Sequence, residues 1–268
     1  MKQSTRLILL FIPIAIAAVL LVSPEHLGAF FNLPGLIVVI GGTLAATFLS
    51  RPASEVLVVL RSIPTLLHEE PPSTAARDFD QLLRFAGRYR VASIRNAERE
   101  IGRIDSSFLR AGLQQVVDCA PEQELEKSLR WRLSTVLRRE QGRVQIINTM
   151  AIFAPAFGML GTLFGLVNML SGLGDSGLQE IGGSMAFAMI TTVYGIIASN
   201  LLFKPLAIKM ERRTNQRLMQ MKTLMEGVLM IYHKRHPAQI RDVLASMQHT
   251  NIETTASARN AGLTLVGA

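Results

Sequence analysis

Four long apolar segments, none of which contains Asp, Glu, Lys, Arg or His, constrain this chain more than any other feature. They cover about residues 7–22, 30–49, 146–170 and 181–203. A helix needs about 20 mostly apolar residues to cross the hydrocarbon core of a bilayer, which is about 30 Å thick. Only 18% of the residues are charged, yet the net charge is +8, so the charged residues are concentrated between these segments. The pattern predicts an all-α integral membrane protein with four transmembrane helices.

The first segment could also be the apolar part of a signal peptide, because Lys2 and Arg6 precede it. A signal peptide ends in a small-residue cleavage site. Here the segment ends in Ser23-Pro24-Glu25, and the second apolar segment begins at about residue 30. We therefore expect residues 1–50 to form a retained N-terminal hairpin of two spans.

The polar stretches have helical patterns and predict three further parts. A helical domain is expected over residues 51–145, a second transmembrane hairpin over 146–203, and a basic helix and tail over 204–268. Within them, short helices are expected over about residues 56–67, 74–89, 93–104, 107–117 and 210–232, with another after Pro237. Pro121 can open a long amphipathic helix over 122–145 that continues into the third span.

Lysine and arginine are distributed with complete asymmetry. All 28 lie in the N-terminal stub, the middle region and the tail, and none lies in loops 23–29 and 171–180. Because cytoplasmic loops carry the excess of basic residues, both termini and the middle region are predicted to be cytoplasmic. This topology accounts for the net positive charge of the chain. No basic motif interleaved with aromatic residues indicates nucleic-acid binding.

The sequence contains no combination of residues typical of an enzyme. One cysteine, Cys119, cannot form an intramolecular disulfide, and the five histidines are scattered without an HExxH motif. There is no pairing of a nucleophile with a base and no phosphate-binding loop. We expect no enzymatic activity, no metal site and no cofactor.

Hydroxyls and prolines mark the third and fourth spans. Thr162, Thr191 and Thr192 place hydroxyls at membrane depth, where they either bond back to helix carbonyls or line a cation path. Pro155 and Pro205 are expected at similar depth and are candidate hinges, because proline removes a helical hydrogen bond. Since no span carries a carboxylate, an ion path would need one from another chain.

Several motifs in these spans resemble the MotA/PomA family of flagellar stator proteins. Residues 155–167 (PAFGMLGTLFGLV), 191–195 (TTVYG) and 200–205 (NLLFKP) are similar to that family's third and fourth spans. Residues 34–43 (PGLIVVIGGT) are similar to its second span. The resemblance covers most of residues 1–235. The third- and fourth-span motifs are shared with the wider MotA/TolQ/ExbB superfamily.

This resemblance implies an ion-driven motor subunit in the bacterial inner membrane. Five copies would form a ring around two copies of a MotB/PomB-type partner, whose aspartate takes up the ion. Flow of the cation, Na⁺ or H⁺, would turn the ring against the rotor protein FliG. Thr162, Thr191 and Thr192 match hydroxyls of the family's ion path, and Pro155 and Pro205 match its functional prolines.

The family's rotor-contacting charges are an arginine and a glutamate eight residues apart. Arg90 and Glu98 have that spacing, within a charged stretch that could equally be a solvated surface. A register that begins at Arg88 would place Asn96 at the second position, and Arg95 is a further candidate. Two other functions remain open: a TolQ/ExbB-like proton-driven transducer, and a passive membrane scaffold. The basic N-terminal hairpin argues against the first, because those relatives usually have three spans.

Overall fold

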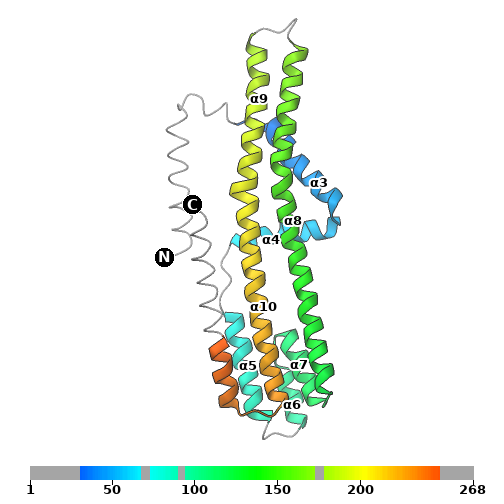
Figure 1. Cartoon of the computed structure of the whole chain (residues 1–268), viewed down its shortest axis with the longest axis vertical. Helices are drawn as coiled ribbons and strands as arrows, with labels where there is room; N and C mark the ends of the chain where they lie inside the picture. The colour runs from blue at the N-terminus through cyan, green and yellow to red at the C-terminus, as the bar shows by residue number, and fades with distance from the viewer. Residues whose placement is uncertain (1–30, 68–72, 90–93, 173–177, 248–268) are drawn as a thin grey trace. The chain divides into compact units, whose positions relative to one another are not determined.

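The computed structural model describes residues 31–67, 73–89, 94–172 and 178–247, and no β-strand occurs among them. The first expected span, residues 7–22, lies outside the described residues. The chain divides into two compact units (Figure 1). We call them the apolar unit, Met1–Arg61 with Gln145–Ala207, and the charged unit, Ser62–Val144 with Ile208–Ala268. The all-helical expectation is confirmed for the described residues.

The second span is a helix with a widened turn. It consists of α2 (Leu33–Leu36), the π-helical segment η2 (Ile37–Gly41) and α3 (Gly42–Ser50). The Asn32 side chain caps it by accepting a hydrogen bond from the Gly35 N–H at 2.9 Å, as N-cap asparagines do. Thr43 and Thr47 are fully buried and donate their hydroxyls to carbonyls one turn earlier in the same helix.

The second hairpin is formed by two longer helical columns. One is α8 (Glu122–Ser171) and the other runs through α9 (Leu178–Ile197), the π-helical segment η3 (Ala198–Phe203) and α10 (Lys204–Tyr232). At 1.5 Å per residue the 50 residues of α8 extend about 75 Å. This is more than twice the thickness of a bilayer core, so only part of α8 can lie in hydrocarbon. The expected continuation of the polar helix into the third span is confirmed.

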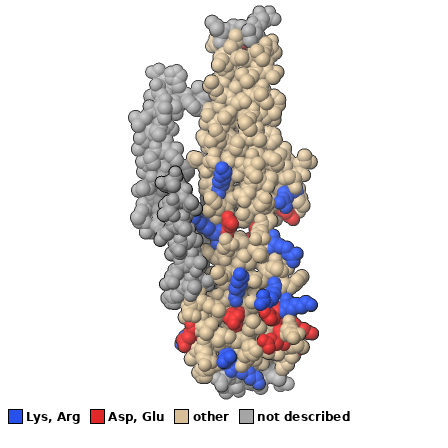
Figure 2. Space-filling model, in the orientation of Figure 1, with Lys and Arg blue, Asp and Glu red and all other residues tan. Residues whose placement is uncertain are grey.

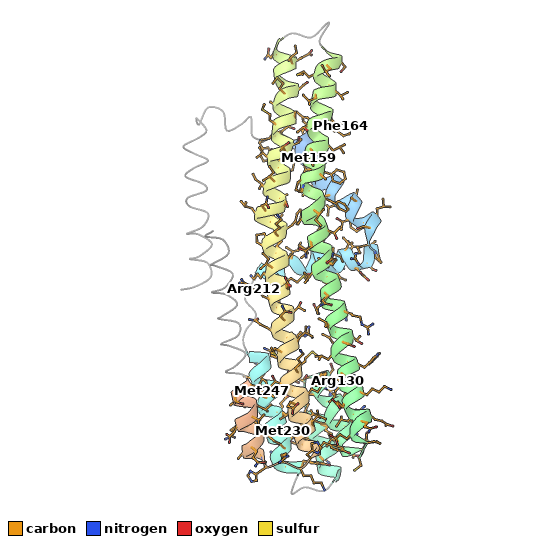
Figure 3. All side chains as sticks on the ribbon, in the orientation of Figure 1. Arg130, Met159, Phe164, Arg212, Met230 and Met247 are labelled. Atoms are coloured by element: carbon orange, nitrogen blue, oxygen red, sulfur yellow. The ribbon has the colours of Figure 1, made fainter. Side chains whose placement is uncertain are left out.

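Three described helices are long and apolar enough to cross a membrane. They are Leu33–Ser50, Glu122–Ser171 and Gln179–Tyr232, and they contain the second, third and fourth expected spans. Many large apolar side chains of α8 remain exposed on the single chain, including Met159 and Phe164, which are labelled in Figure 3. Exposed apolar surface of this extent requires lipid or protein partners.

The charged unit is built from short helices and the polar parts of α8 and α10. The short helices are α5 (Ser73–Tyr89), α6 (Ile94–Ile101), α7 (Ser107–Val117) and a helix over residues 237–247. The helix α4 (Ala53–Leu67) contains the boundary between the two units, which lies between Arg61 and Ser62. It begins three residues before its expected start, because the Glu55 and Val56 N–H groups donate to the Pro52 carbonyl. On the face drawn in Figure 2, the charged side chains gather over the charged unit.

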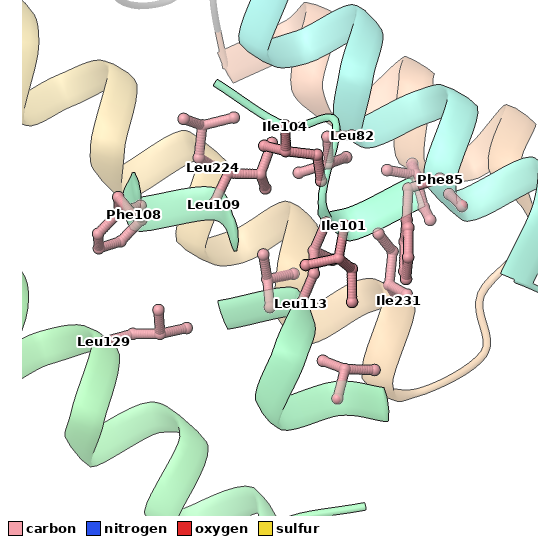
Figure 4. Packing of buried hydrophobic residues seen from close by; sticks show 14 of the residues in the cluster. Leu82, Phe85, Ile101, Ile104, Phe108, Leu109, Leu113, Leu129, Leu224 and Ile231 are labelled. Carbon is pink, nitrogen blue, oxygen red and sulfur yellow. The ribbon is translucent and has the colours of Figure 1, made fainter. Parts of the chain in front are cut away.

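A single hydrophobic cluster holds the charged unit together (Figure 4). Its fully buried members include Leu82, Leu109, Leu113 and Leu125. A Cβ at Gly112 of α7 would lie 3.1 Å from the Leu129 side chain, which shows how closely α7 packs against α8. The core therefore joins helices that are far apart in the sequence.

Candidate functional site

The α8–α9 hairpin is packed through glycines, so the two backbones lie almost in contact. A Cβ at Gly195 would lie 2.7 Å from the Ala154 carbonyl oxygen, and one at Gly158 would lie 3.0 Å from the Thr191 carbonyl oxygen. A Cβ at Gly165 would lie 2.7 Å from the Ala188 Cβ. Small residues allow such an approach in membranes, where helix association depends on close packing. Gly158, Gly165 and Gly195 therefore lie at this interface.

Thr191 lies inside the packed interface of the apolar unit. Its side chain is fully buried, and its hydroxyl donates to the Ala188 carbonyl at 2.8 Å. A Cβ at Gly161 would lie 2.6 Å from the Thr191 Cβ, and one at Gly35 would lie 3.0 Å from its methyl group. Thr191 thus fills the space where the second, third and fourth spans meet. Its role in an ion path stays a prediction.

Thr162 and Thr192, in contrast, are partly exposed on the single chain. The Thr162 hydroxyl donates to the Met159 carbonyl at 2.6 Å. Gly158 lies one turn before Thr162 on the same face of α8, and a Cβ at Gly158 would lie 3.4 Å from the Thr192 Cα. The hairpin therefore places the two threonines within about one turn of each other, with their side chains accessible from outside the chain.

The second span is fastened to this hairpin at two levels. The Asn32 N–H donates to the Tyr194 hydroxyl of α9 at 2.9 Å. Further along, a Cβ at Gly42 would lie 2.2 Å from the Phe157 ring, so this aromatic side chain occupies the space that a larger residue would need. Tyr194, which is not among the residues expected at the site, therefore joins two spans.

The two prolines occupy different levels of the hairpin. Pro155 lies inside α8, and its Cα is 3.2 Å from the Cβ position of Gly195. Pro205 follows Gly195 by ten residues, which is about 15 Å along a helix. It is the second residue of α10, directly after the widened turns of η3. The expectation of similar depth does not hold, because Pro155 packs against α9 and not against the turn that contains Pro205.

Ser199 is a polar residue of the hairpin that is not among the residues expected at the site. It is buried in η3, and its hydroxyl donates to the Ala151 carbonyl of α8 at 2.7 Å. The available signal was Pro155, because a proline leaves the carbonyl four residues earlier without its helical donor. Recognising Ser199 would have required the pairing of the two helices.

Charges of the expected rotor-contacting stretch lie on α5 and α6. Arg88 forms an ion pair with Glu100, and Arg103 approaches the same carboxylate at 3.6 Å. Glu98 is exposed on α6. Arg90 lies outside the described residues, and Arg95 lies in α6 without a described side chain. The structure therefore shows Arg88 engaged within the chain, while contact with a rotor stays a prediction for all four expected residues.

Asp78 of α5 is a partly buried carboxyl beside a second one. Burial raises the pKa of Asp78, the nearby Asp105 carboxylate raises it further, and a hydrogen bond with Ser106 lowers it. The Gln81 side-chain amide donates to Asp105 at 3.4 Å. The two carboxylates therefore repel each other where α5 meets the segment that leads into α7.

Replacing Asp78 by asparagine should stabilise the protein at neutral pH. Its raised pKa means that the folded state binds a proton more tightly, so stability falls as pH rises from the unfolded value of 3.8 through the folded value. We expect Asp78→Asn to raise the thermal midpoint at pH 7, with convergence on the parent protein below about pH 4. Exposed Asp80 supplies the matched control, Asp80→Asn. An equal gain for Asp78→Asn at both pH values would contradict the explanation.

No group of three or more histidine, cysteine or acidic residues in the described part of the chain could hold a metal ion. Cys119 is exposed and unpaired. At the level of Gly158 the hairpin places the hydroxyls of Thr162 and Thr192 where they are partly exposed. Such oxygen ligands suit hard cations, but they supply no group that could itself titrate near neutral pH.

Comparisons with known proteins agree with this architecture. Residues 100–223 match the model of the MotA/TolQ/ExbB proton channel family. The chain is 32% identical over 213 residues to Motility protein A of Treponema pallidum, across 77% of this chain and 79% of that protein. It is 34% identical over 141 residues to the chemotaxis protein PomA of Vibrio alginolyticus, across 53% and 55% of the two chains.

Solved structures with a similar fold include chains of two MotAB complexes. The flagellar MotAB stator complex from Bacillus subtilis contains a chain with a TM-score of 0.78 and 25% identity, and the match covers 92% of this chain and 96% of that one. MotAB of C. jejuni gives a TM-score of 0.79 with 19% identity and the same coverage. At that lower identity the second likeness concerns the fold alone.

Proposed function

Because this chain belongs to the MotA/PomA family of flagellar stator proteins, we propose that it is the ring-forming A subunit of a stator in the bacterial inner membrane. The observation that carries the proposal is the pair of apolar segments 146–170 and 181–203, which contain no Asp, Glu, Lys, Arg or His. Glycines bring these two parts of the α8–α9 hairpin into close contact, while Thr162 and Thr192 remain partly exposed beside the interface. Two tightly packed helices with exposed hydroxyls can line a cation path without holding the ion permanently.

The ion-binding carboxylate comes from a MotB/PomB-type partner. The four apolar segments contain no Asp, Glu, Lys, Arg or His, and an ionisable group is the usual mark of an ion path in a membrane. A partner aspartate would therefore face Thr162 and Thr192, whereas buried Thr191 would support the wall from within. The family likeness and the MotAB structures support such a partner.

Several copies of the chain surround the partner, and five is the number that the resemblance implies. The exposed apolar side chains of α8 and α9 provide more surface than the second span covers within one chain. Both termini and the charged unit lie in the cytoplasm, in keeping with the distribution of lysine and arginine. The three described apolar helices support the second, third and fourth of the four proposed spans, and the apolar segment 7–22 is the proposed first span.

The charged unit transmits torque to the rotor protein FliG. Arg90 and Glu98 are the proposed contact residues, because Arg88 is engaged by Glu100 within the chain while Glu98 is exposed. Charged contacts of this kind fix register and speed encounter more than they add affinity. Rotation of the ring would then move these charges past the rotor.

Motility of a deletion strain tests both the function and the coupling ion. Swimming speed is measured after complementation, with and without sodium, and in parallel with a protonophore. A swimming speed that scales with the sodium concentration would establish Na⁺ as the coupling ion. A swimming speed that is independent of sodium but falls to zero when the protonophore is added would establish H⁺. Unchanged swimming after deletion would contradict the stator role and favour a TolQ/ExbB-like transducer.

The double variant Thr162→Val and Thr192→Val tests the proposed path. Loss of two oxygens beside a cation should reduce swimming speed about tenfold or more, since hydrogen bonds to charged groups contribute about 1.5–3 kcal/mol. Thr149→Val is the matched control, because the Thr149 hydroxyl donates to the Gln145 carbonyl of its own helix at 2.8 Å. Normal speed in the double variant would support a passive scaffold instead.

A further inference from the structure

A proline in the middle of α8 leaves one backbone carbonyl without its normal partner. Pro155 has no N–H, so the Ala151 carbonyl four residues earlier receives no α-helical hydrogen bond from it. Ala151 is buried, and the surrounding segment is one of the apolar spans. In hydrocarbon no water is available to satisfy such a group, so another donor must reach it.

Ser199 supplies that donor from the facing column. Its hydroxyl lies 2.7 Å from the Ala151 carbonyl oxygen, across 48 residues of sequence, and its side chain is 1% exposed. Serine and threonine hydroxyls inside helices usually bond to a carbonyl of their own helix. Thr43, Thr47 and Thr191 of the same unit do so. The direction of the Ser199 bond is therefore unusual for this part of the molecule.

Two features of the fourth span allow Ser199 to reach across. Gly195, one turn earlier, brings the backbones so close that a short side chain can bridge them. Ser199 also lies in the widened segment η3, where its own carbonyl accepts the Lys204 N–H five residues later. That π-type bond directly precedes Pro205, and such widened turns occur frequently at functional sites.

We propose that Ser199 is a positioning residue that couples the two proline-bearing segments of the hairpin. Its hydroxyl completes the interrupted turn at Pro155, while its backbone forms part of the widened turn before Pro205. A movement of the turn at Pro155 then strains the hydrogen bond of the Ser199 hydroxyl, and with it the widened turn before Pro205. A movement of that widened turn displaces Ser199 and strains the same hydrogen bond to the Ala151 carbonyl. The two candidate hinges lie on facing helices, with Pro205 about 15 Å along its helix from Gly195, the residue that faces Pro155. Through Ser199 they act as one hinge and not as two.

Hydrogen–deuterium exchange tests this bond without relying on motility. The full chain is studied in lipid nanodiscs together with the subunits that co-purify with it. In Ser199→Ala, amides of residues 151–160 should exchange about 2–10 times faster, the factor that corresponds to the net contribution of one hydrogen bond. Ser171→Ala is the matched control, because that hydroxyl donates to the Asn168 carbonyl of its own helix at 3.0 Å.

A double-mutant cycle with Pro155→Ala separates the bond from ordinary packing. An alanine at position 155 restores the N–H that the Ala151 carbonyl lacks, so Ser199→Ala should add no further acceleration in that background. Equal acceleration in both backgrounds, or none in the parent background, would overturn the proposal.

The part of the inference that concerns hinge coupling rests on the proposed stator function. In a motile strain, Ser199→Ala should lower swimming speed more in the parent background than in the Pro155→Ala background. If the gene proves unnecessary for swimming, the stator proposal fails, while the exchange cycle still decides whether Ser199 satisfies the proline turn. The coupling of the two prolines would be overturned if Ser199→Ala accelerated amide exchange but lowered swimming speed by the same factor in the parent and the Pro155→Ala backgrounds.

Discussion

Gly195→Val is expected to abolish motility and to leave little folded protein in the membrane. A Cβ at position 195 would meet the Ala154 carbonyl oxygen at 2.7 Å and the Gly158 Cα at 3.1 Å. These atoms belong to the backbone, so no side chain can rotate away to make room. Overpacking of a tight interface costs about 1–3 kcal/mol, and we expect at least the upper end here because the obstacle is the main chain itself.

Gly182→Val provides the matched control on the same helix. A Cβ at Gly182 meets no atom within 4 Å, so the same substitution adds a side chain to open space. Membrane abundance, elution volume in detergent and swimming speed are compared for the two variants. Folded and motile Gly195→Val protein would show that the hairpin can separate at this level without loss of structure.

Phe85→Ala should have the second largest effect, and it acts on the charged unit. Phe85 is 2% exposed in the hydrophobic cluster and stacks on Tyr89 with ring centroids 5.5 Å apart. Truncating a buried phenylalanine typically costs about 3–5 kcal/mol through lost burial and a residual cavity. The charged unit should therefore lose a large share of its stability and have a clearly lower thermal midpoint, because native domains are stable by only about 5–15 kcal/mol.

The neighbouring residue Arg84 allows a control within one turn of the same helix. Arg84 is exposed, so Arg84→Ala should change stability by less than about 0.5 kcal/mol. Thermal unfolding and protease resistance of the solubilised protein distinguish the two variants. Similar losses for both would mean that the α5 helix, and not the cluster around Phe85, limits the stability of the unit.

Local sequence signals predicted the helices better than the contacts between them. The expected helix over residues 107–117 coincides with α7, because Ser106 caps its start by accepting the Leu109 N–H. The joining of the polar helix to the third span also followed from the sequence, since no proline lies between residue 122 and the start of that span at residue 146. Helical periodicity and capping chemistry depend on neighbours within a few residues, so they can be recognised in one chain.

The arrangement of the candidate site could not be predicted from the sequence, because it depends on which helix faces pack against each other. Thr191 and Thr192 are adjacent, yet the first is fully buried and the second is partly exposed. Which face of α9 meets α8 decides that difference, and both faces are apolar. The widened segments η2 and η3 also depart from a regular helical period, so the orientation of Ser199 toward Ala151 followed only from three-dimensional packing.

The hydroxyl bonds of the second span have a consequence for biosynthesis. Residues 33–50 leave the ribosome well before Thr191, the residue whose methyl group fills the space beside Gly35. Until the α8–α9 hairpin has been synthesised, residues 33–50 are in the bilayer without their packing partner. Thr43 and Thr47 satisfy their hydroxyls within their own helix, so no unpaired polar group needs a chaperone or a partner. The late-made hairpin can then dock onto a span that is already stably inserted.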